Sequence, residues 1–225
     1  MTDGSGDAVT SLYAAFAAGD VAAAISVVEQ ARAVAVQRDL FDSLFAPAMA
    51  MLGGAWARGE LDEYAFAEAA VVADQVVSFV TTPPALQDSG VTVVIGTMRD
   101  DGHAIAKNIV ASVLRLAGHR VVDLGDNVTG TEFAQRAEDS GARIVIVCAE
   151  QLASARAVVQ VSEALAAAGR EDVTLLACGG PFVADTALAR AAGVRGVVGT
   201  AEGALQLVDR FASVAESTSR GGASS

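Results

Sequence analysis

From Val91 onward, short apolar runs alternate with longer segments whose apolar residues recur at three- and four-residue steps. The short runs are typical of buried strands, and the longer periodic segments are typical of amphipathic helices. The predicted strands are Val91–Gly96, Arg120–Asp123, Ile144–Cys148, Thr174–Cys178 and Gly196–Val198. The predicted helices are Ile105–Ala117, Thr131–Ser140, Ser154–Ala168, Val183–Ala192 and Ala201–Ser213. Strands that alternate with helices predict an α/β domain with a doubly wound parallel sheet of five strands.

The residues before this domain follow a helical pattern throughout. The predicted helices are Asp7–Ala18, Val21–Gln37, about Leu40–Arg58 and about Asp62–Phe79, with Asp20 as the N-cap of the second. Short connections between them predict a four-helix bundle. Pro83-Pro84 cannot continue a helix. The predicted organisation is a helical bundle at 1–82, a linker at 83–90, the α/β domain at 91–213 and a Ser- and Gly-rich disordered tail at 214–225.

Charge and hydropathy argue against several classes of function. The formal net charge is −12 and no basic cluster interrupts it, whereas nucleic-acid binding needs a Lys- and Arg-rich surface. The acidic start is unlike a signal peptide. Glu68 and Asp74 interrupt the apolar run Ala65–Val80, which is short for a membrane span. We therefore expect a cytoplasmic protein that binds neither nucleic acid nor membrane, with Cys148 and Cys178 buried and reduced.

One of the two histidines lies in the segment Gly96–Asn108, between a predicted strand and a predicted helix. Such a loop stands at the carboxyl edge of the sheet, where open α/β folds bind ligands. Asp101 precedes His103 by two residues, and a carboxylate that holds one ring nitrogen leaves the other free for a metal. The spacing alone is also compatible with an ordinary loop histidine. The second histidine, His119, is expected to be a solvated loop residue.

The sequence GTMRDDGHAIAKN at 96–108 resembles the signature loop of cobalamin-binding domains of the methionine synthase and corrinoid-protein type, G-T-V-x-x-D-x-H-x-x-G-K-N. The matching residues are Gly96, Thr97, Asp101, His103, Lys107 and Asn108. The resemblance covers about 91–213, where Asp123-Leu124-Gly125, Cys178-Gly179-Gly180-Pro181 and Gly193-Val194-Arg195-Gly196 are similar to later family motifs. It implies a flavodoxin-like domain that binds cobalamin in its methyl or adenosyl form.

The resemblance also implies roles for the loop residues. In that family the loop histidine is the lower axial ligand of cobalt, an aspartate hydrogen-bonds it, and a serine extends this relay. His103 is accordingly the implied cobalt ligand, with Asp101 and Ser154 behind it. Gly102, between the aspartate and the histidine, is implied to lie against the cofactor.

Other residues fall where the family holds the nucleotide tail of the cofactor. The pair Gly179-Gly180 matches a glycine turn that approaches the cofactor closely. Cys148 and Glu150 replace a serine and a leucine of that pocket, and Ala106 replaces a glycine of the histidine loop. We expect an altered tail pocket, because a methyl group crowds a close backbone approach and a carboxylate beside an apolar group costs desolvation energy.

The helical half resembles the cap bundle of the same proteins. Phe45-Ala46-Pro47-Ala48-Met49 is similar to L-x-P-x-M, and 53–61 is similar to G-x-x-(F/W)-x-x-G-x-(I/L). The resemblance implies that Trp56 faces the cofactor, although a tryptophan there can also belong to the bundle core. Light-sensing regulators share this bundle and resemble W-x9-E-H, but Phe66 and Ala67 stand at the last two positions.

These observations favour a corrinoid methyl carrier that serves a partner methyltransferase, a carrier subunit rather than a complete enzyme. A second hypothesis is a cobalamin-dependent light sensor that acts through a regulatory protein partner. A third is a variant that binds heme or another tetrapyrrole through His103, and a fourth is a module without a cofactor. The sequence is compatible with a homo-oligomer.

Overall fold

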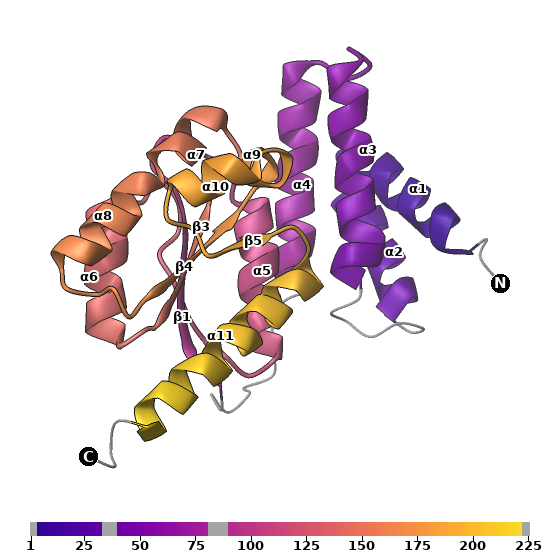
Figure 1. The fold of residues 1–225 in the computed structure, drawn as a ribbon. Helices are drawn as coiled ribbons and strands as arrows, with labels where there is room; N and C mark the ends of the chain where they lie inside the picture. Colours follow the sequence, from indigo (N-terminus) through magenta and orange to yellow (C-terminus); the bar gives the residue numbers. More distant parts are fainter. Residues whose placement is uncertain (1–3, 33–39, 81–89, 222–225) are drawn as a thin grey trace. The chain divides into compact units, whose positions relative to one another are not determined.

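The computed structural model describes residues 4–32, 40–80 and 90–221, and the chain divides into two units, Met1–Thr82 and Pro83–Ser225 (Figure 1). The expected linker at 83–90 lies outside the described residues except for Gly90. Residues 33–37 of the second predicted helix also lie outside them.

The first unit is a helical bundle. Its helices are α1 (Gly4–Ala17), α2 (Val21–Arg32), α3 (Ala46–Ala57) and α4 (Glu63–Val80), and a π-helical turn, η1 (Phe41–Phe45), leads directly into α3. Phe16, Phe41 and Phe45 are fully buried, and the Phe41 and Phe45 ring centroids lie 5.5 Å apart. Among the described residues, no helix is long and apolar enough to cross a membrane.

Local signals account for the starts of these helices. Asp20 Oδ1 accepts a hydrogen bond from Ala23 N at 2.9 Å, which confirms the predicted N-cap of α2. Asp62 caps α4 in the same way through Ala65 N at 2.8 Å. The predicted helix Leu40–Arg58 is divided because Pro47, in the first turn of α3, has no N–H to donate to the preceding turn.

The second unit is built on a parallel sheet in the order β2-β1-β3-β4-β5. The strands are β1 (Thr92–Thr97), β2 (Arg120–Asp123), β3 (Ile144–Cys148), β4 (Thr174–Cys178) and β5 (Gly196–Val198). Four of the five coincide with the predicted strands, and β1 is shifted by one residue. The order is flavodoxin-like, and it confirms the predicted fold class.

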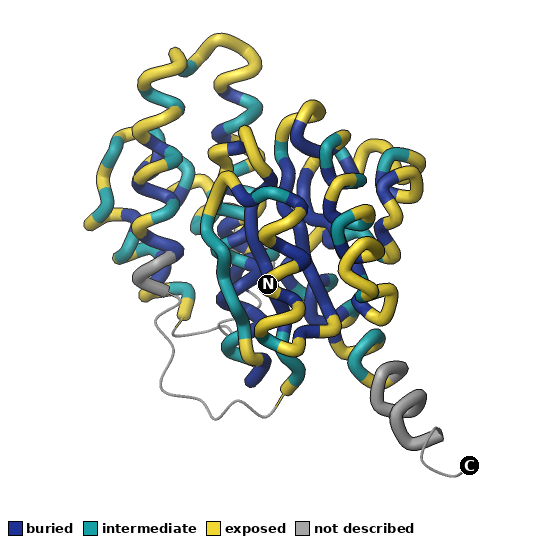
Figure 2. The backbone as a smooth tube through the Cα atoms, turned by 90° about the vertical axis from the view of Figure 1, so that its left-hand side faces the viewer, coloured by how far each residue is buried: buried dark blue, intermediate teal, exposed yellow. Residues whose placement is uncertain are grey.

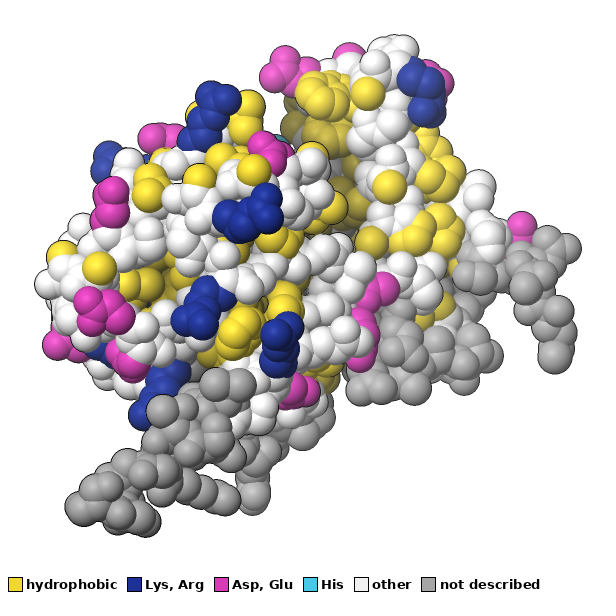
Figure 3. Space-filling model, viewed as in Figure 1, with side chains coloured by type: hydrophobic (Ala, Val, Ile, Leu, Met, Phe, Trp, Pro, Cys, Tyr) yellow, Lys and Arg dark blue, Asp and Glu magenta, His cyan; other side chains and the backbone are white. Residues whose placement is uncertain are grey.

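Helices cover both faces of this sheet (Figure 1). α5 (Ile105–Leu116) and α11 (Ala201–Gly221) pack on one face, and α6 (Gly130–Ser140) and α8 (Val159–Ala167) pack on the other. β1, β3 and β4 form the dark-blue, buried centre of the unit in Figure 2. On the face of the unit turned to the viewer in Figure 3, cationic and anionic side chains are interspersed.

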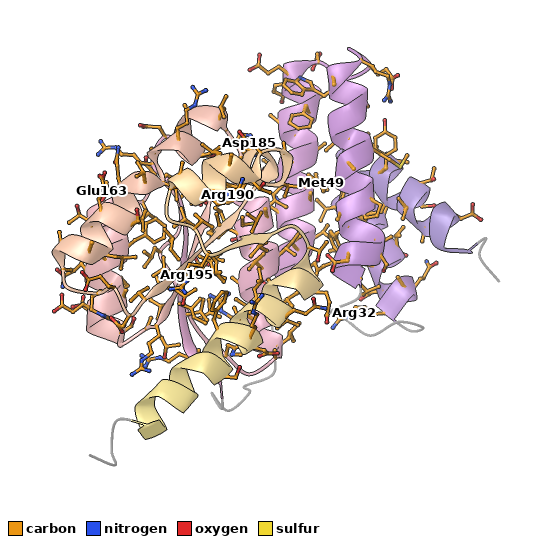
Figure 4. The ribbon with its side chains drawn as sticks, in the orientation of Figure 1. Arg32, Met49, Glu163, Asp185, Arg190 and Arg195 are labelled. Carbon is orange, nitrogen blue, oxygen red and sulfur yellow. The ribbon has the colours of Figure 1, made fainter. Side chains whose placement is uncertain are left out.

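Three helices of this unit differ from their predicted bounds by more than one residue. The segment predicted as Ser154–Ala168 forms α7 (Leu152–Ala157) and α8, separated at Val158, whose N–H bonds to the Ala155 carbonyl in a tighter turn. The segment predicted as Val183–Ala192 forms α9 (Gly180–Ala184) and α10 (Thr186–Ala191). Asp185 separates this pair, because its extended backbone and its side chain cap α10 at Ala187 N (labelled in Figure 4). α11 continues to Gly221, so 214–221 of the expected disordered tail are helical; no proline ends the helix there.

Candidate functional site

The candidate site lies at the carboxyl edge of the sheet, where the loops after β1, β3 and β4 meet. The order of the strands reverses between β1 and β3, and such a switch point is the usual ligand site of an open α/β sheet. The loop after β1 is held from both sides. Met98 N bonds to the Cys148 carbonyl at 2.8 Å, and Arg99 N bonds to the Val128 carbonyl at 2.9 Å. The backbone that carries His103 is therefore fixed to both neighbouring strand ends.

Asp101 is the centre of this site, and its side chain is completely buried. One carboxylate oxygen, Oδ1, accepts from His103 Nδ1 at 2.7 Å and from His103 N at 3.2 Å. The other, Oδ2, accepts from Ser154 Oγ at 2.6 Å, Glu150 N at 2.7 Å and Gln151 N at 3.0 Å. The structure thus brings together the three residues Asp101, His103 and Ser154 that the sequence singles out.

The hydrogen bonds set the charge of Asp101. Burial by itself raises the pKa of this carboxyl, but the bonds from Ser154, Gln151, His103 and Glu150 together outweigh burial and lower its pKa to about 2. Asp101 is therefore an anion at neutral pH, and it fixes the His103 proton on Nδ1. Nε2 then carries the lone pair that a metal needs.

The exposure of His103 suits ligand binding. Its side chain is 55% exposed, although its carboxylate partner is buried. Within the described part of the chain, no group of three or more His, Cys, Asp or Glu residues could enclose a metal ion. The exposed ring nitrogen of His103, held by a buried carboxylate, can serve as a single metal ligand.

A row of small side chains crosses the sheet directly below this edge. Thr97, Cys148 and Cys178 are in register on β1, β3 and β4. Their neighbours Val147 and Ala177 belong to the core under α6 and α8, so the row lies on the α5 and α11 face. Thr97 Oγ1 is buried and has no hydrogen-bond partner among the residues that the structure describes. The pKa of the Cys148 thiol is raised, mainly by a hydrogen bond with Cys178 and also by burial.

The loops after β3 and β4 meet above this row. Gly179 has φ +135°, and a Cβ there would collide with the Ala149 carbonyl oxygen, so only glycine fits. Gly180 N donates to Glu150 Oε2 at 3.0 Å. The structure therefore joins Glu150 and the glycine pair in one cluster, a contact that the sequence does not reveal.

The remaining predicted residues are more dispersed. Gly102 is exposed, and Ala106 is half-buried in the first turn of α5. Trp56 is in the other unit, on α3, where it is 49% exposed and stacks on Phe66 with ring centroids 5.1 Å apart. Trp56 is therefore not part of the buried bundle core, and its expected contact with the cofactor stays a prediction.

Lys107 has a clear structural role that the motif match alone did not provide. Its buried ammonium group donates to both oxygens of Asp123, at 2.8 and 2.9 Å, and to Asn108 Oδ1 at 2.7 Å. These bonds hold α5 against the end of β2, and α5 begins two residues after His103. A buried lysine is stable only when it is paired in this way.

The edge of the sheet fits a cofactor that carries its own metal and takes one nitrogen ligand from the protein. His103 offers one free nitrogen, and a polar group of such a cofactor can supply the partner that the buried Thr97 hydroxyl lacks among the described residues. The parallel sheet and this site define a ligand-binding domain of the flavodoxin-like class. The chain belongs to the B12-binding domain family, whose model matches residues 91–209. This membership confirms the predicted family and supports a B12-type corrinoid as the cofactor.

Several curated relatives are corrinoid proteins. Trimethylamine corrinoid protein 1 of Methanosarcina acetivorans is 39% identical over 97 residues, which are 43% of this chain and 45% of that protein. Dimethylamine corrinoid protein 1 of Methanosarcina mazei is 28% identical over 163 residues, which are 71% of this chain and 76% of that protein. The chain therefore matches less than half the length of the first of these relatives.

Solved structures share the whole architecture. The monomethylamine corrinoid protein of Methanosarcina barkeri is 17% identical, with 91% of this chain and 98% of that chain covered and a TM-score of 0.79. A chain of the methanol:cobalamin methyltransferase complex of the same organism is 19% identical, with 95% and 81% covered and a TM-score of 0.52. At these identities the likeness shows a common fold.

Proposed function

We propose that the chain is a corrinoid methyl carrier that binds its cofactor through His103 and serves a partner methyltransferase. The observation that carries this proposal is the exposed His103 imidazole held by a buried, anionic Asp101. The similarity to trimethylamine and dimethylamine corrinoid proteins supports the methyl-carrying role and favours a methyl over an adenosyl group on the metal. A bound corrinoid supplies the cobalt that accepts and releases the methyl group.

The protein itself determines which ring nitrogen of His103 is free to bind a metal. Asp101 keeps a proton on Nδ1 of His103, so that Nε2 is the atom directed to the metal. Nε2 would hold the metal when a corrinoid is bound, and the Asp101 carboxylate would stabilise a positive charge on the imidazole when Nε2 is free and protonated. Ser154 and the Glu150 and Gln151 N–H groups keep Asp101 ionised in both situations.

The other candidate residues are proposed to surround the cofactor. Gly102 and Ala106 flank the ligand histidine in sequence. Thr97, Cys148 and Cys178 offer polar groups on the α5 and α11 face, below Glu150, Gly179 and Gly180. Trp56 offers an exposed aromatic face from the bundle.

Absorption titration tests the proposal. The purified chain is titrated with hydroxocobalamin, methylcobalamin and hemin, in darkness and in light. We expect spectral changes with both corrinoids, and the variant His103→Gly is expected to lose the nitrogen-ligated spectrum. Free imidazole should restore that spectrum in His103→Gly, because it fills the vacated position.

Other results distinguish the alternatives. No spectral change with either corrinoid would overturn the proposal, and a change with hemin alone would favour the tetrapyrrole variant. A change in assembly state that depends on light would favour the sensor. Transfer of the methyl group from the methylated chain to a thiol acceptor, with a corrinoid methyltransferase present, would support the carrier.

A further inference from the structure

Glu150 belongs to the loop after β3, and its side chain contacts the loop after β4. Its Oε2 accepts from Gly180 N at 3.0 Å, while its own backbone N–H donates to Asp101 at 2.7 Å. The same residue therefore connects the histidine relay to the glycine turn after β4. Within the described residues, the Glu150 carboxylate accepts from Gly180 N alone and is half-exposed, whereas the buried Asp101 carboxylate accepts from five donors.

The Glu150 carboxylate lies at the carboxyl edge of the sheet, just beyond the row formed by Thr97, Cys148 and Cys178. Glu150 follows Cys148 by two residues, and its carboxylate accepts from the N–H of Gly180, which follows Cys178 by two residues, so the charge lies beside the ends of β3 and β4. Thr97 Oγ1, in the same row, is fully buried and lacks a hydrogen-bond partner in the part of the chain that the structure describes. A buried hydroxyl in that condition is normally satisfied by a ligand or water.

A negative charge in this position affects B12-type cofactors unequally. Cobalamin carries a nucleotide tail joined through a phosphodiester, which is an anion with acceptor oxygens only, whereas cobinamide ends before that group. A phosphodiester that reaches the row competes with Glu150 for Gly180 N–H and is repelled by the carboxylate. The tail base is not needed for ligation, because His103 supplies a nitrogen of its own.

We infer that Glu150 is a specificity-determining residue, which disfavours corrinoids with a phosphodiester-linked tail relative to corrinoids without one. This inference rests on the proposed corrinoid binding. His103 would then bind the metal, and Glu150 would select among corrinoids by their tails.

The test compares two probes, hydroxocobalamin and aquohydroxocobinamide, by absorption titration of the full chain. The measured quantity is the ratio of their dissociation constants. The cost of displacing the tail base from cobalt is the same in every variant, so it cancels when these ratios are compared. Glu150→Ala removes both the charge and the acceptor, and we expect it to favour hydroxocobalamin by about tenfold.

Two further variants make the test specific. Glu150→Gln keeps an acceptor oxygen for Gly180 N–H but loses the charge, so it should move the ratio in the same direction by about threefold. Glu163→Ala removes a carboxylate from an exposed position on α8 (labelled in Figure 4) and should leave the ratio unchanged. Glu150→Gln also preserves the loop contact, so it reports even when Glu150→Ala does not fold.

The possible failures are distinguishable. Binding of both corrinoids with the same ratio in all variants would overturn the inference and leave the proposed function intact. An equal change in Glu163→Ala would also overturn it, because the effect would then be one of net charge. If the unsubstituted chain bound neither corrinoid, the proposed function and this inference would both fall.

Discussion

The two histidines of the chain have the same kind of partner and opposite surroundings. His103 is 55% exposed, and Asp101 behind it is fully buried, with 2.7 Å between Nδ1 and Oδ1. His119 is only 7% exposed, and Asp209 on α11 is 69% exposed, with 3.4 Å between Nε2 and Oδ1. The first pair stands at the carboxyl edge of the sheet and the second stands just before β2, at the amino edge.

The difference shows what distinguishes a ligand histidine from a structural one. An imidazole that must bind a metal needs an accessible nitrogen and a carboxylate whose charge does not depend on solvent. A buried imidazole beside an exposed carboxylate has neither, and it serves to pack the end of α5 against α11. His119 is therefore not the solvated loop residue that its sequence position predicts: it is buried, with Gly90 against its ring and Asp209 of α11 at 3.4 Å.

The largest expected effect follows from removing the buried carboxylate. Asp101→Ala leaves Ser154 Oγ, His103 Nδ1 and the Glu150 and Gln151 N–H groups without their acceptor. We expect the free energy of unfolding to fall by about 3 kcal/mol. Urea denaturation at pH 7 measures this change. A loss no larger than that of Asp209→Ala would contradict the contrast between the pairs.

The next effect is a dependence of stability on pH. The pKa of Asp101 is lowered to about 2 in the folded chain, against about 3.9 for an unfolded aspartate. Its contribution is therefore fully present above about pH 4 and is lost as pH falls through about 2. It amounts to about 2 kcal/mol. The difference in unfolding free energy between the unsubstituted chain and Asp101→Asn should shrink over this window; a constant difference would contradict the assignment.

A smaller effect is expected for the serine behind the carboxylate. Ser154→Ala removes one of several donors to Asp101, and it should lower the free energy of unfolding by about 1 kcal/mol. Ser162→Ala is the matched control, because the Ser162 hydroxyl bonds only to a carbonyl of its own helix, that of Val159. We expect the control to change stability by less than about 0.5 kcal/mol. Equal losses in the two variants would indicate that Ser154 acts only within its own helix.

The smallest effect belongs to the second histidine's partner. Asp209 is exposed and 3.4 Å from His119, so Asp209→Ala should change the free energy of unfolding by less than about 0.5 kcal/mol. The corrinoid spectrum should not change at all. A spectral shift in this variant would show that the amino edge of the sheet influences the metal site.

Local sequence patterns predicted most of the α/β unit. Apolar runs such as Ile144–Cys148 coincide with the strands because every residue of a central strand is buried, which leaves a continuous signal. The close approach of Asp101 and His103 was also accessible, since the two residues are neighbours in one loop. Ser154 was reached through the family motif rather than through any local pattern.

The contacts that sequence reasoning missed join distant parts of the chain. Glu150 meets Gly180 across 30 residues, and His119 pairs with Asp209 of α11, which lies 90 positions later. Neither contact leaves a periodic signal, because each depends on how two loops or a loop and a helix pack. The division of α9 from α10 is similar, since it depends on a single extended residue, Asp185.

The row beneath the site also gives the chain an internal chemical reporter. The sequence contains two cysteines, and both lie in this row, buried and reduced on adjacent strands. Any thiol-reactive dye that labels the native chain must therefore have reached this place. The rate of labelling reports how readily this small region opens, and no tag has to be introduced. A ligand bound above the row would slow the labelling.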